Sequence, residues 1–271
     1  MRYGTVVVAM LLSSASADLV CAQEQSSETS PSDKPSTRIG LYGFLPTIKG
    51  DVGFRGVEAD IDISKSDLLD DLDSAFMALA EHRRGRWSLI ADLAYLDISQ
   101  SGGQRVTGPL GLVQGTVRAD IEFQQVLFES GVGYRVLDHD LEHGRISVDA
   151  LAGARYNWIE AELGAEVSVL GLTAASDREG DEQWVDGIFG FRAEYRANAR
   201  WSLSGWADYG LGTDSHSYQL ASFVNYQFHN GLMLSGGYRQ YHMHYTTGSG
   251  SSRLEFDLDY TGPMVGLTYT F

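Results

Sequence analysis

The stretch "MVGLTYTF", residues 264–271, decides the fold class. Every second residue in it is apolar, and the residues between are Gly or Thr; the apolar positions are Val265, Leu267, Tyr269 and Phe271. Alternation with a period of two is typical of a β-strand that has one apolar and one polar face. The last residues of most soluble domains fray in water. We therefore expect this segment to be a strand whose final side chain the fold requires.

Similar alternation recurs along the chain from Arg38 onward, in stretches of about ten residues. After the first residues, no run of about 20 apolar residues exists that could form a transmembrane helix. In the last stretch the apolar residues stand at even positions before residues 261–263 and at odd positions after them. Such a change of strand face predicts a β-bulge there. The predicted strands are residues 38–49, 74–82, 87–98, 116–136, 146–162, 184–196, 201–212, 218–228, 232–245 and 254–271.

The connections between these strands alternate in length. Short turns are expected at residues 83–86, 137–144, 197–200 and 229–231, and longer loops at residues 50–73, 99–115, 167–183, 213–217 and 246–253. Short turns on one side and longer loops on the other are typical of outer-membrane barrels. We predict an all-β, closed antiparallel up-and-down transmembrane β-barrel of about ten strands, with short periplasmic turns. Eight or twelve strands remain alternatives, because residues 52–63 can form their own hairpin.

Apolar and charged side chains separate onto the two faces of these strands. In residues 201–211, for example, Trp201, Leu203 and Tyr209 share one face, and Asp208 lies on the other. A ten-stranded barrel is narrow, so charges inside it must pair. We expect salt bridges that largely plug the lumen; a narrow channel gated by them is the alternative. The predicted lumen charges are Glu81, Asp92, Glu129, Arg135, Asp149, Arg155, Asp186, Arg192, Glu194, Asp208 and Arg239.

The N-terminal segment has the layout of an export signal. Residues 5–12 are apolar, follow Arg2 and precede small residues, which predicts a signal peptide over residues 1–22. Residues 23–37, rich in Ser, Pro, Glu and Lys, are expected to be a flexible periplasmic linker. The sole cysteine, Cys21, precludes a disulfide within the chain, and its lipidation is a minor alternative.

The formal net charge of -16 argues against nucleic acid as a partner. The most acidic loop, residues 50–73, contains a short helical turn in which Ser66 is the expected N-cap. Its carboxylates lack the Gly-punctuated spacing of a calcium loop, so we expect a solvated loop and no metal site. No motif calls for a cofactor.

Four motifs carry a resemblance to a known class: "TGPMVGLTYTF" at 261–271, "GGYRQY" at 236–241, "AGARYNW" at 152–158 and "WVDGIFGFR" at 184–192. With them, residues 38–271 resemble small Gram-negative outer-membrane β-barrel proteins of the porin-like or surface-antigen type. The resemblance implies that Tyr269 and Phe271 form the signal that the barrel-assembly machinery reads. It also implies the cell outer membrane as location, its lipids and lipopolysaccharide as partners, and a monomer.

Some barrels of this kind are hydrolases with sites near the outer rim. Asp214 and His216 form an Asp-x-His pair that looks like part of the omptin protease pattern, with Asp97 as the only nearby partner candidate. His242 and His244 near Ser249 suggest a Ser-His-acid alternative. The ordinary interpretation is that these are rim residues. The sequence thus predicts a structural or surface-interaction barrel first, a narrow channel second and a rim hydrolase third.

Overall fold

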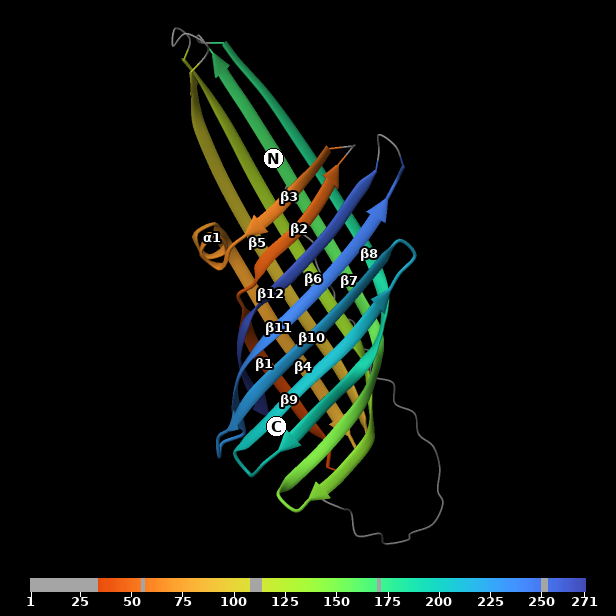
Figure 1. Ribbon diagram of the computed structural model, residues 1–271. Coiled ribbons are helices and arrows are strands. Elements are labelled where there is room, and N and C mark those ends of the chain that lie inside the picture. Colours follow the sequence, from red (N-terminus) through yellow and green to blue (C-terminus); the bar gives the residue numbers. More distant parts are fainter. Residues whose placement is uncertain (1–33, 55–56, 108–113, 170–171, 250–252) are drawn as a thin grey trace. The chain divides into compact units, whose positions relative to one another are not determined.

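The structure, a computed structural model, describes residues 34–54, 57–107, 114–169, 172–249 and 253–271. The predicted signal peptide, Cys21 and most of the predicted linker lie outside these residues. The described chain is almost entirely antiparallel β (Figure 1). Its strands are β1 (Ser36–Phe44), β2 (Thr47–Phe54), β3 (Val57–Ile63), β4 (Leu72–Arg84), β5 (Trp87–Thr107), β6 (Gln114–Leu141), β7 (Gly144–Val169), β8 (Leu172–Arg196), β9 (Trp201–Leu211), β10 (Ser215–Gln227), β11 (Leu232–Thr247) and β12 (Leu254–Thr270).

Ten of these strands, β1 and β4 to β12, form a closed barrel. Neighbouring strands in the wall are β1, β4, β5 and so on to β12, and β1 then pairs with β12. The closing register runs from Arg38 opposite Thr270 to Phe44 opposite Met264. Closure removes both sheet edges, which a bilayer requires because it offers no hydrogen-bond partner. The predicted fold class and strand number are confirmed, and β2 and β3 are the two additional strands.

Tight turns join the strands at the end of the barrel where β1 begins and β12 ends. Three of these turns contain a glycine with positive φ, Gly85, Gly144 and Gly231. Other residues adopt this conformation only with strain, so glycine permits the short reversal. The predicted turns at residues 83–86, 197–200 and 229–231 are confirmed. The one at residues 137–144 is shorter than predicted, because β6 continues to Leu141 and β7 begins at Gly144.

The first predicted strand, residues 38–49, is divided in two. β1 ends at Phe44 and β2 begins at Thr47, with Leu45 and Pro46 between them. Pro46 has no N–H group and cannot continue the ladder. Beyond the break β2 pairs with the outer half of β12, from Thr47 opposite Thr261 to Phe54 opposite Leu254, and β3 pairs with β2.

A short helix, α1 (Lys65–Asp70), connects β3 to β4. Its N-cap is Ser64 and not the predicted Ser66, because Ser64 and Asp67 form a capping box in which each side chain accepts the other residue's backbone N–H. Leu68 is buried, whereas Leu69 is exposed. In the part of the chain that the structure describes, no helix has the length and apolar character needed to cross a bilayer.

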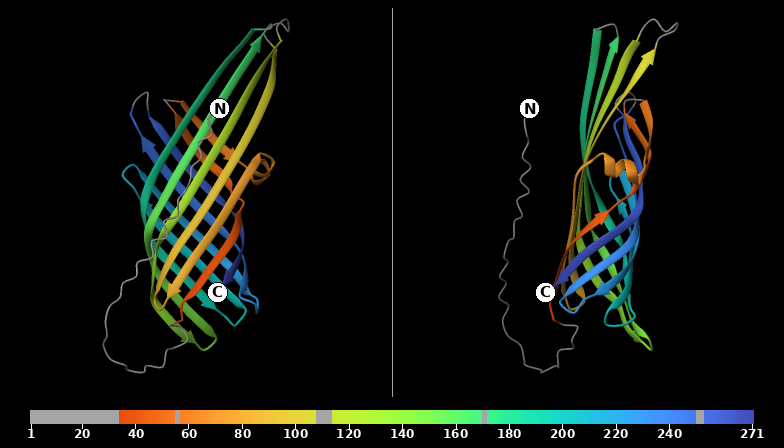
Figure 2. Two further views of the ribbon diagram at one scale, coloured as in Figure 1. Left: turned by 180° about the vertical axis from the view of Figure 1, so that it is seen from behind. Right: turned by 90° about the vertical axis from the view of Figure 1, so that its left-hand side faces the viewer.

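Strands β5 to β8 continue well beyond their neighbours as a four-stranded sheet (Figure 2). The predicted loops at residues 99–115 and 167–183 are therefore wrong over most of their length. Their Gly- and Ser-rich composition disfavours strands locally. The partner strands nevertheless provide a continuous backbone ladder, from Ser99 opposite Glu122 to Thr107 opposite Gln114, for example.

The predicted bulge at residues 261–263 is also wrong. The register of β11 and β12 is unbroken there, from Tyr241 opposite Tyr260 to Tyr238 opposite Pro263. Phe256, Leu258 and Tyr260 are buried inside the barrel. In the outer half of β12 the apolar residues point inward, because the outer half of the barrel interior is apolar. No shift in register is needed to explain their position.

The outward face of the barrel carries a belt of exposed apolar side chains. It is formed by Ile39, Leu41, Phe76, Leu89, Phe128, Val132, Phe189, Phe191, Leu203, Leu220, Val224, Leu234, Val265 and Leu267. Exposed aromatic residues mark its turn end, namely Trp87, Trp201, Phe228, Tyr269 and Phe271. Such a belt and girdle on a closed barrel match the hydrocarbon layer and its interface. The chain is an outer-membrane β-barrel protein, and its turns face the periplasm.

Candidate functional site: the filled barrel interior

The layer of the interior nearest the periplasmic turns is a network of ions from opposite walls. Asp149 of β7 accepts hydrogen bonds from Arg135 Nε of β6 at 2.6 Å, Arg83 Nη2 of β4 at 2.5 Å and Arg192 Nη2 of β8 at 3.0 Å. Arg192 also donates to Glu81 of β4 at 2.7 and 3.0 Å. The Asp149 side chain is only 3% exposed. Each buried carboxylate is therefore compensated by more than one cation, as burial of charge requires.

Arg155 organises the next layer outward. Its side chain is fully buried and donates to Glu129 Oε1 at 2.8 Å and Asp208 Oδ1 at 2.6 Å. Its third contact, at 2.8 Å, is with the Ser217 hydroxyl, which itself donates to Asp186. These five residues come from β6, β7, β8, β9 and β10. One guanidinium thus connects half of the barrel wall across the lumen.

Two predicted charges lie in the same layer without a close ion pair. Asp92 accepts a 2.6 Å hydrogen bond from the Tyr42 hydroxyl. Arg239 lies 3.6 Å from Glu129, beyond good hydrogen-bond geometry. The Arg239 guanidinium instead lies over the rings of Phe44 and Tyr241, at 5.6 and 5.5 Å.

Of the eleven residues predicted for the lumen network, the structure brings ten into these two layers. Glu194 is the exception, since it pairs with the exposed Arg196 at 3.1 Å near the turns. The network also includes residues that the sequence prediction missed. Arg83 lies on the same strand face as Glu81, two residues away, but falls in the turn predicted at residues 83–86. Tyr42 and Ser217 carry no charge, so only their inward parity could have indicated them.

The outer part of the interior is apolar and aromatic. The Trp184 and Tyr245 rings stack at 4.3 Å, and Phe256 lies 6.5 Å from both. Leu68 of α1 packs into the same core. The other buried members are Ile48, Ile98, Leu127, Ile159, Tyr241, Met243, Leu258 and Tyr260. The barrel therefore holds a packed core above two ionic layers.

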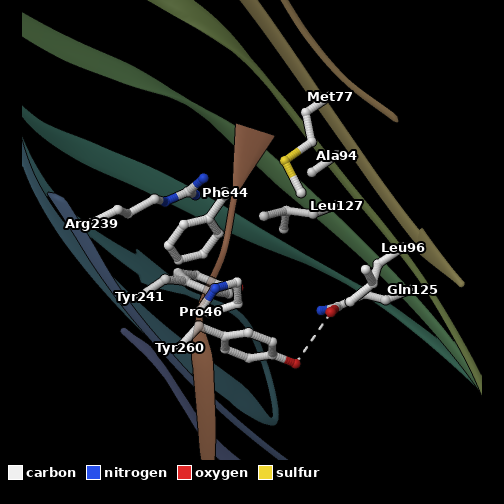
Figure 3. A pocket seen from close by; sticks show the side chains of 10 residues that line it. All are labelled: Phe44, Pro46, Met77, Ala94, Leu96, Gln125, Leu127, Arg239, Tyr241 and Tyr260. Carbon is white, nitrogen blue, oxygen red and sulfur yellow. Dashed lines mark hydrogen bonds between the residues drawn. The ribbon is translucent and has the colours of Figure 1, made fainter. Parts of the chain in front are cut away.

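A small cavity of about 50 Å³ remains between the ionic and apolar layers (Figure 3). Figure 3 shows Phe44, Tyr241 and Arg239 on one side of it and Met77 and Leu127 on the other. Tyr260 donates a 3.2 Å hydrogen bond to Gln125 at its edge. The remaining lining residues are Pro46, Ala94 and Leu96.

A second cluster lies on the outward face of the outer wall. His242 and His244 of β11 lie 3.2 Å from Asp259 and 3.4 Å from Asp257 of β12, respectively. The Nε2 atom of His244 is also 3.2 Å from the Thr246 hydroxyl. Hydroxyl, imidazole and carboxylate thus follow the order of a catalytic triad. Among the described residues, no group of His, Cys, Asp and Glu is arranged to hold a metal ion.

The Asp-x-His pair is not assembled as an omptin-like site. Asp214 is exposed in the loop before β10, and the His216 ring lies 4.8 Å from that of His244 on the outward face. Asp97 accepts a hydrogen bond from Tyr95, its neighbour on the same face of β5. Because β5 and β10 lie in different parts of the wall and these residues have outward parity, Asp97 and His216 do not meet across the rim.

Tyr269 and Phe271 lie at the periplasmic rim next to the closing strand pair. Their rings meet edge-on at 4.8 Å, and both are exposed on the outer face. The Phe271 backbone N–H donates to Thr37 O at 2.9 Å. Both rings are therefore exposed where the first and last strands close the barrel.

No protein-family model and no curated protein matches the sequence. Several solved outer-membrane barrels are similar in fold. The outer-membrane protease OmpT from Escherichia coli matches at a TM-score of 0.47 and 10% identity, over 90% of this chain and 99% of that one. Ail, the attachment invasion locus protein of Yersinia pestis, gives 0.31 and 11%, over 88% and 98%. A Pseudomonas aeruginosa FadL homologue gives 0.27 and 10%, over 88% and 90%.

Proposed function

We propose that this protein is a closed, non-conducting barrel whose strands β5–β8 act as a surface-interaction platform outside the cell. The observation that carries the proposal is the extension of these four strands beyond the barrel. β8 has β9 as a neighbour only from Gly187 onward, so residues 172–186 pair on one side alone among the described strands. At about 3.3 Å per residue, this unpaired edge is roughly 50 Å long.

An edge of this kind is suited to binding. Unpaired backbone N–H and C=O groups accept an added strand from a partner, which provides affinity without a pocket. β5 has a similar edge beyond Ile98, where its pairing with β4 ends. Natural proteins usually cover or shorten such edges. Two long edges on one projecting sheet therefore support a role in contacts with another chain or surface.

The filled interior supports the closed state over the alternative of a narrow channel. Arg155, Asn157 and Asp186 have no exposed surface, and the apolar core lies over them. Opening a water path would require the separation of several charged hydrogen bonds, each worth about 1.5–3 kcal/mol. The lumen residues thus serve the stability of the barrel.

The experiment removes the outer part of the platform, which shortens the unpaired β8 edge from residues 172–186 to residues 177–186, and leaves the barrel. Ser101 pairs with Asp120, and Gly164 pairs with Asp177, so residues 102–119 and 165–176 can be replaced by Asn-Gly turns without changing the register below. Cells that display either form are measured for adhesion to one another and to immobilised extracellular-matrix proteins. We expect wild type to adhere above the empty-vector level and the trimmed form, which has a shorter edge, to adhere less than wild type. Equal adhesion of all three would contradict the proposal.

Hydrolysis at the outer wall is a second candidate, favoured by the order Thr246, His244, Asp257. This candidate is tested by measuring the turnover of lipid A and peptide substrates by wild type and by His244→Ala. His229→Ala, in a periplasmic turn, is the matched control. Turnover that only His244→Ala abolishes would support a hydrolase. Absence of turnover by wild type would exclude this candidate and leave the platform untouched.

A further inference from the structure

The two halves of the β5–β8 platform differ in charge (Figure 2). Along the free β8 edge, residues 172–185 and the β7 residues that pair with them, 156–169, contain one arginine and seven acidic residues, a formal net charge of -6. The outer parts of β5 and β6, residues 99–107 and 114–123, contain two arginines and two acidic residues and are neutral. More than a third of the chain's net charge of -16 therefore lies beside the β8 edge. The seven acidic residues are Glu160, Glu162, Glu166, Asp177, Glu179, Asp181 and Glu182.

At the base of the free edge, carboxylates are close to one another. Glu160 of β7 stands directly opposite Asp181 of β8, and Asp181 is exposed. Glu182, the next residue, accepts a 3.1 Å hydrogen bond from the uncharged hydroxyl of Tyr245. Like charges at opposite positions of a sheet destabilise each other. A cation on the free side of Asp181 would relieve this repulsion.

The same edge offers backbone groups to an added strand. In a sheet, every second residue of a strand directs its N–H and C=O to the same side. Residues 172–186 pair with β7 on one side, and β9 begins to pair with β8 only at Gly187. About seven residues therefore direct backbone groups to the side that has no described strand. This length suffices for a strand of the usual five to six residues or so.

Charge decides which strand this edge accepts. If two copies of the chain paired antiparallel through their β8 edges, centred on Glu179, Asp177 of each copy would stand opposite Asp181 of the other. Such like-charge pairs disfavour this dimer. The β5 edge of a second copy is a poor partner as well, because Arg105 is its only cation. A strand that carries several Lys or Arg residues matches the β8 edge in both hydrogen bonds and charge.

We propose that the β8 edge binds a basic, extended segment of another protein, which joins the sheet as an added strand. The inference rests on the proposed surface function, since it names the partner of the same platform. Backbone hydrogen bonds provide the affinity, and the acidic β7–β8 side selects basic segments over acidic ones. Because exposed charges are screened by salt, the selection weakens as the ionic strength rises.

The test uses the full mature barrel in nanodiscs of zwitterionic lipid, so that the lipid does not attract the probes. Binding of short peptides is titrated by biolayer interferometry, with empty nanodiscs as the background. The probes are a peptide of alternating Lys and Thr, one of alternating Glu and Thr, and the Lys-Thr peptide N-methylated at every residue. The methylated peptide keeps the charge but cannot donate backbone hydrogen bonds. We expect saturable binding of the Lys-Thr peptide, and binding about 10-fold weaker or less for the other two.

A charge reversal locates the site. Asp181→Lys should weaken binding of the Lys-Thr peptide about 3- to 10-fold. Asp140→Lys, the same change at an exposed aspartate at the periplasmic end of β6, is the matched control and should bind as wild type does. Equal binding by wild type and Asp181→Lys would overturn the assignment to the β8 edge.

The peptides alone also decide the proposal on wild type, without any variant. Equal binding of the methylated and unmethylated Lys-Thr peptides would overturn strand addition, and equal binding of the Lys-Thr and Glu-Thr peptides would overturn selection by charge. Binding of the Lys-Thr peptide no greater than that to empty nanodiscs would overturn the inference as a whole. The adhesion experiment is read separately, so the platform can stand when the basic partner fails.

Discussion

Arg192 of β8 and Glu81 of β4, 111 residues apart in the chain, meet across the lumen with Nη2 and Oε1 2.7 Å apart. β4 and β8 are separated in the wall by β5, β6 and β7, so this ion pair connects opposite sides of the barrel. Arg83 and Asp149 make a second such connection between β4 and β7. The barrel is therefore held together through its interior as well as around its circumference.

The ionic layer makes Asp149 the most sensitive single charge. Asp149→Asn leaves Arg83, Arg135 and Arg192 with one carboxylate fewer, and we expect a loss of about 3–5 kcal/mol in the free energy of unfolding. Glu194→Gln is the control, because the half-buried Glu194 pairs with the exposed Arg196 and such a pair near the surface contributes about 0–1 kcal/mol. Urea unfolding in lipid vesicles, followed by tryptophan fluorescence, measures both. Equal losses for the two variants would show that the interior network is not the stabilising element.

The orientation of the outer half of β12 can be tested with two adjacent cysteines. In a Cys21→Ser background, Asp259→Cys is expected to react quickly with a water-soluble thiol reagent, because the Asp259 side chain is 47% exposed. Leu258→Cys should stay protected until the barrel unfolds, since Leu258 is 3% exposed inside the core. Fast labelling at 258 and protection at 259 would restore the bulge that the sequence suggested.

The aromatic residues at the end of β12 predict an assembly defect. Deletion of Phe271 removes the edge-on contact with Tyr269 and the hydrogen bond from its N–H to Thr37 O. We expect less folded barrel in the outer membrane, scored by the shift in gel mobility on heating. Phe228→Ala, another exposed aromatic residue at the periplasmic rim, is the control and should assemble normally. Equal yields would remove Phe271 from a role in assembly.

Asp214 and His216 are not expected to support proteolysis. His216 contacts His244 on the outward face, and Asp97 bonds with Tyr95 elsewhere on the wall. His216→Ala should therefore leave any peptide cleavage by the barrel at the wild-type level. A selective loss of cleavage in this variant would establish the omptin-like pair.

Much of the fold could be predicted because lipid imposes a period of two on every strand. Leu203 and Asp208, for example, stand at odd and even positions of one strand, and their side chains face the lipid and the lumen, respectively. The prediction failed where this rule stops. Inside the outer half, Phe256 and Leu258 face a packed core, so apolar no longer means outward. Beyond the bilayer, ladders between partner strands decide the structure, and single-sequence patterns such as "SQSGG" at 99–103 look like a loop.

The site was predicted where charge and parity coincide, as at Arg155 and Asp149. It was missed where uncharged groups complete the network, as at Tyr42 and Ser217, because Tyr and Ser are common on either face. The weak pairing of Arg239 depends on distances across the lumen, which no sequence spacing shows.

The closed lumen is tested most directly by conductance in planar bilayers. The purified barrel, reconstituted alongside a wide porin as a positive control, should give no steady single-channel steps at any applied voltage. Steady steps of uniform size from wild type would mean that water and ions pass Arg155 and the core above it. The filled interior, and the non-conducting role that rests on it, would then be wrong.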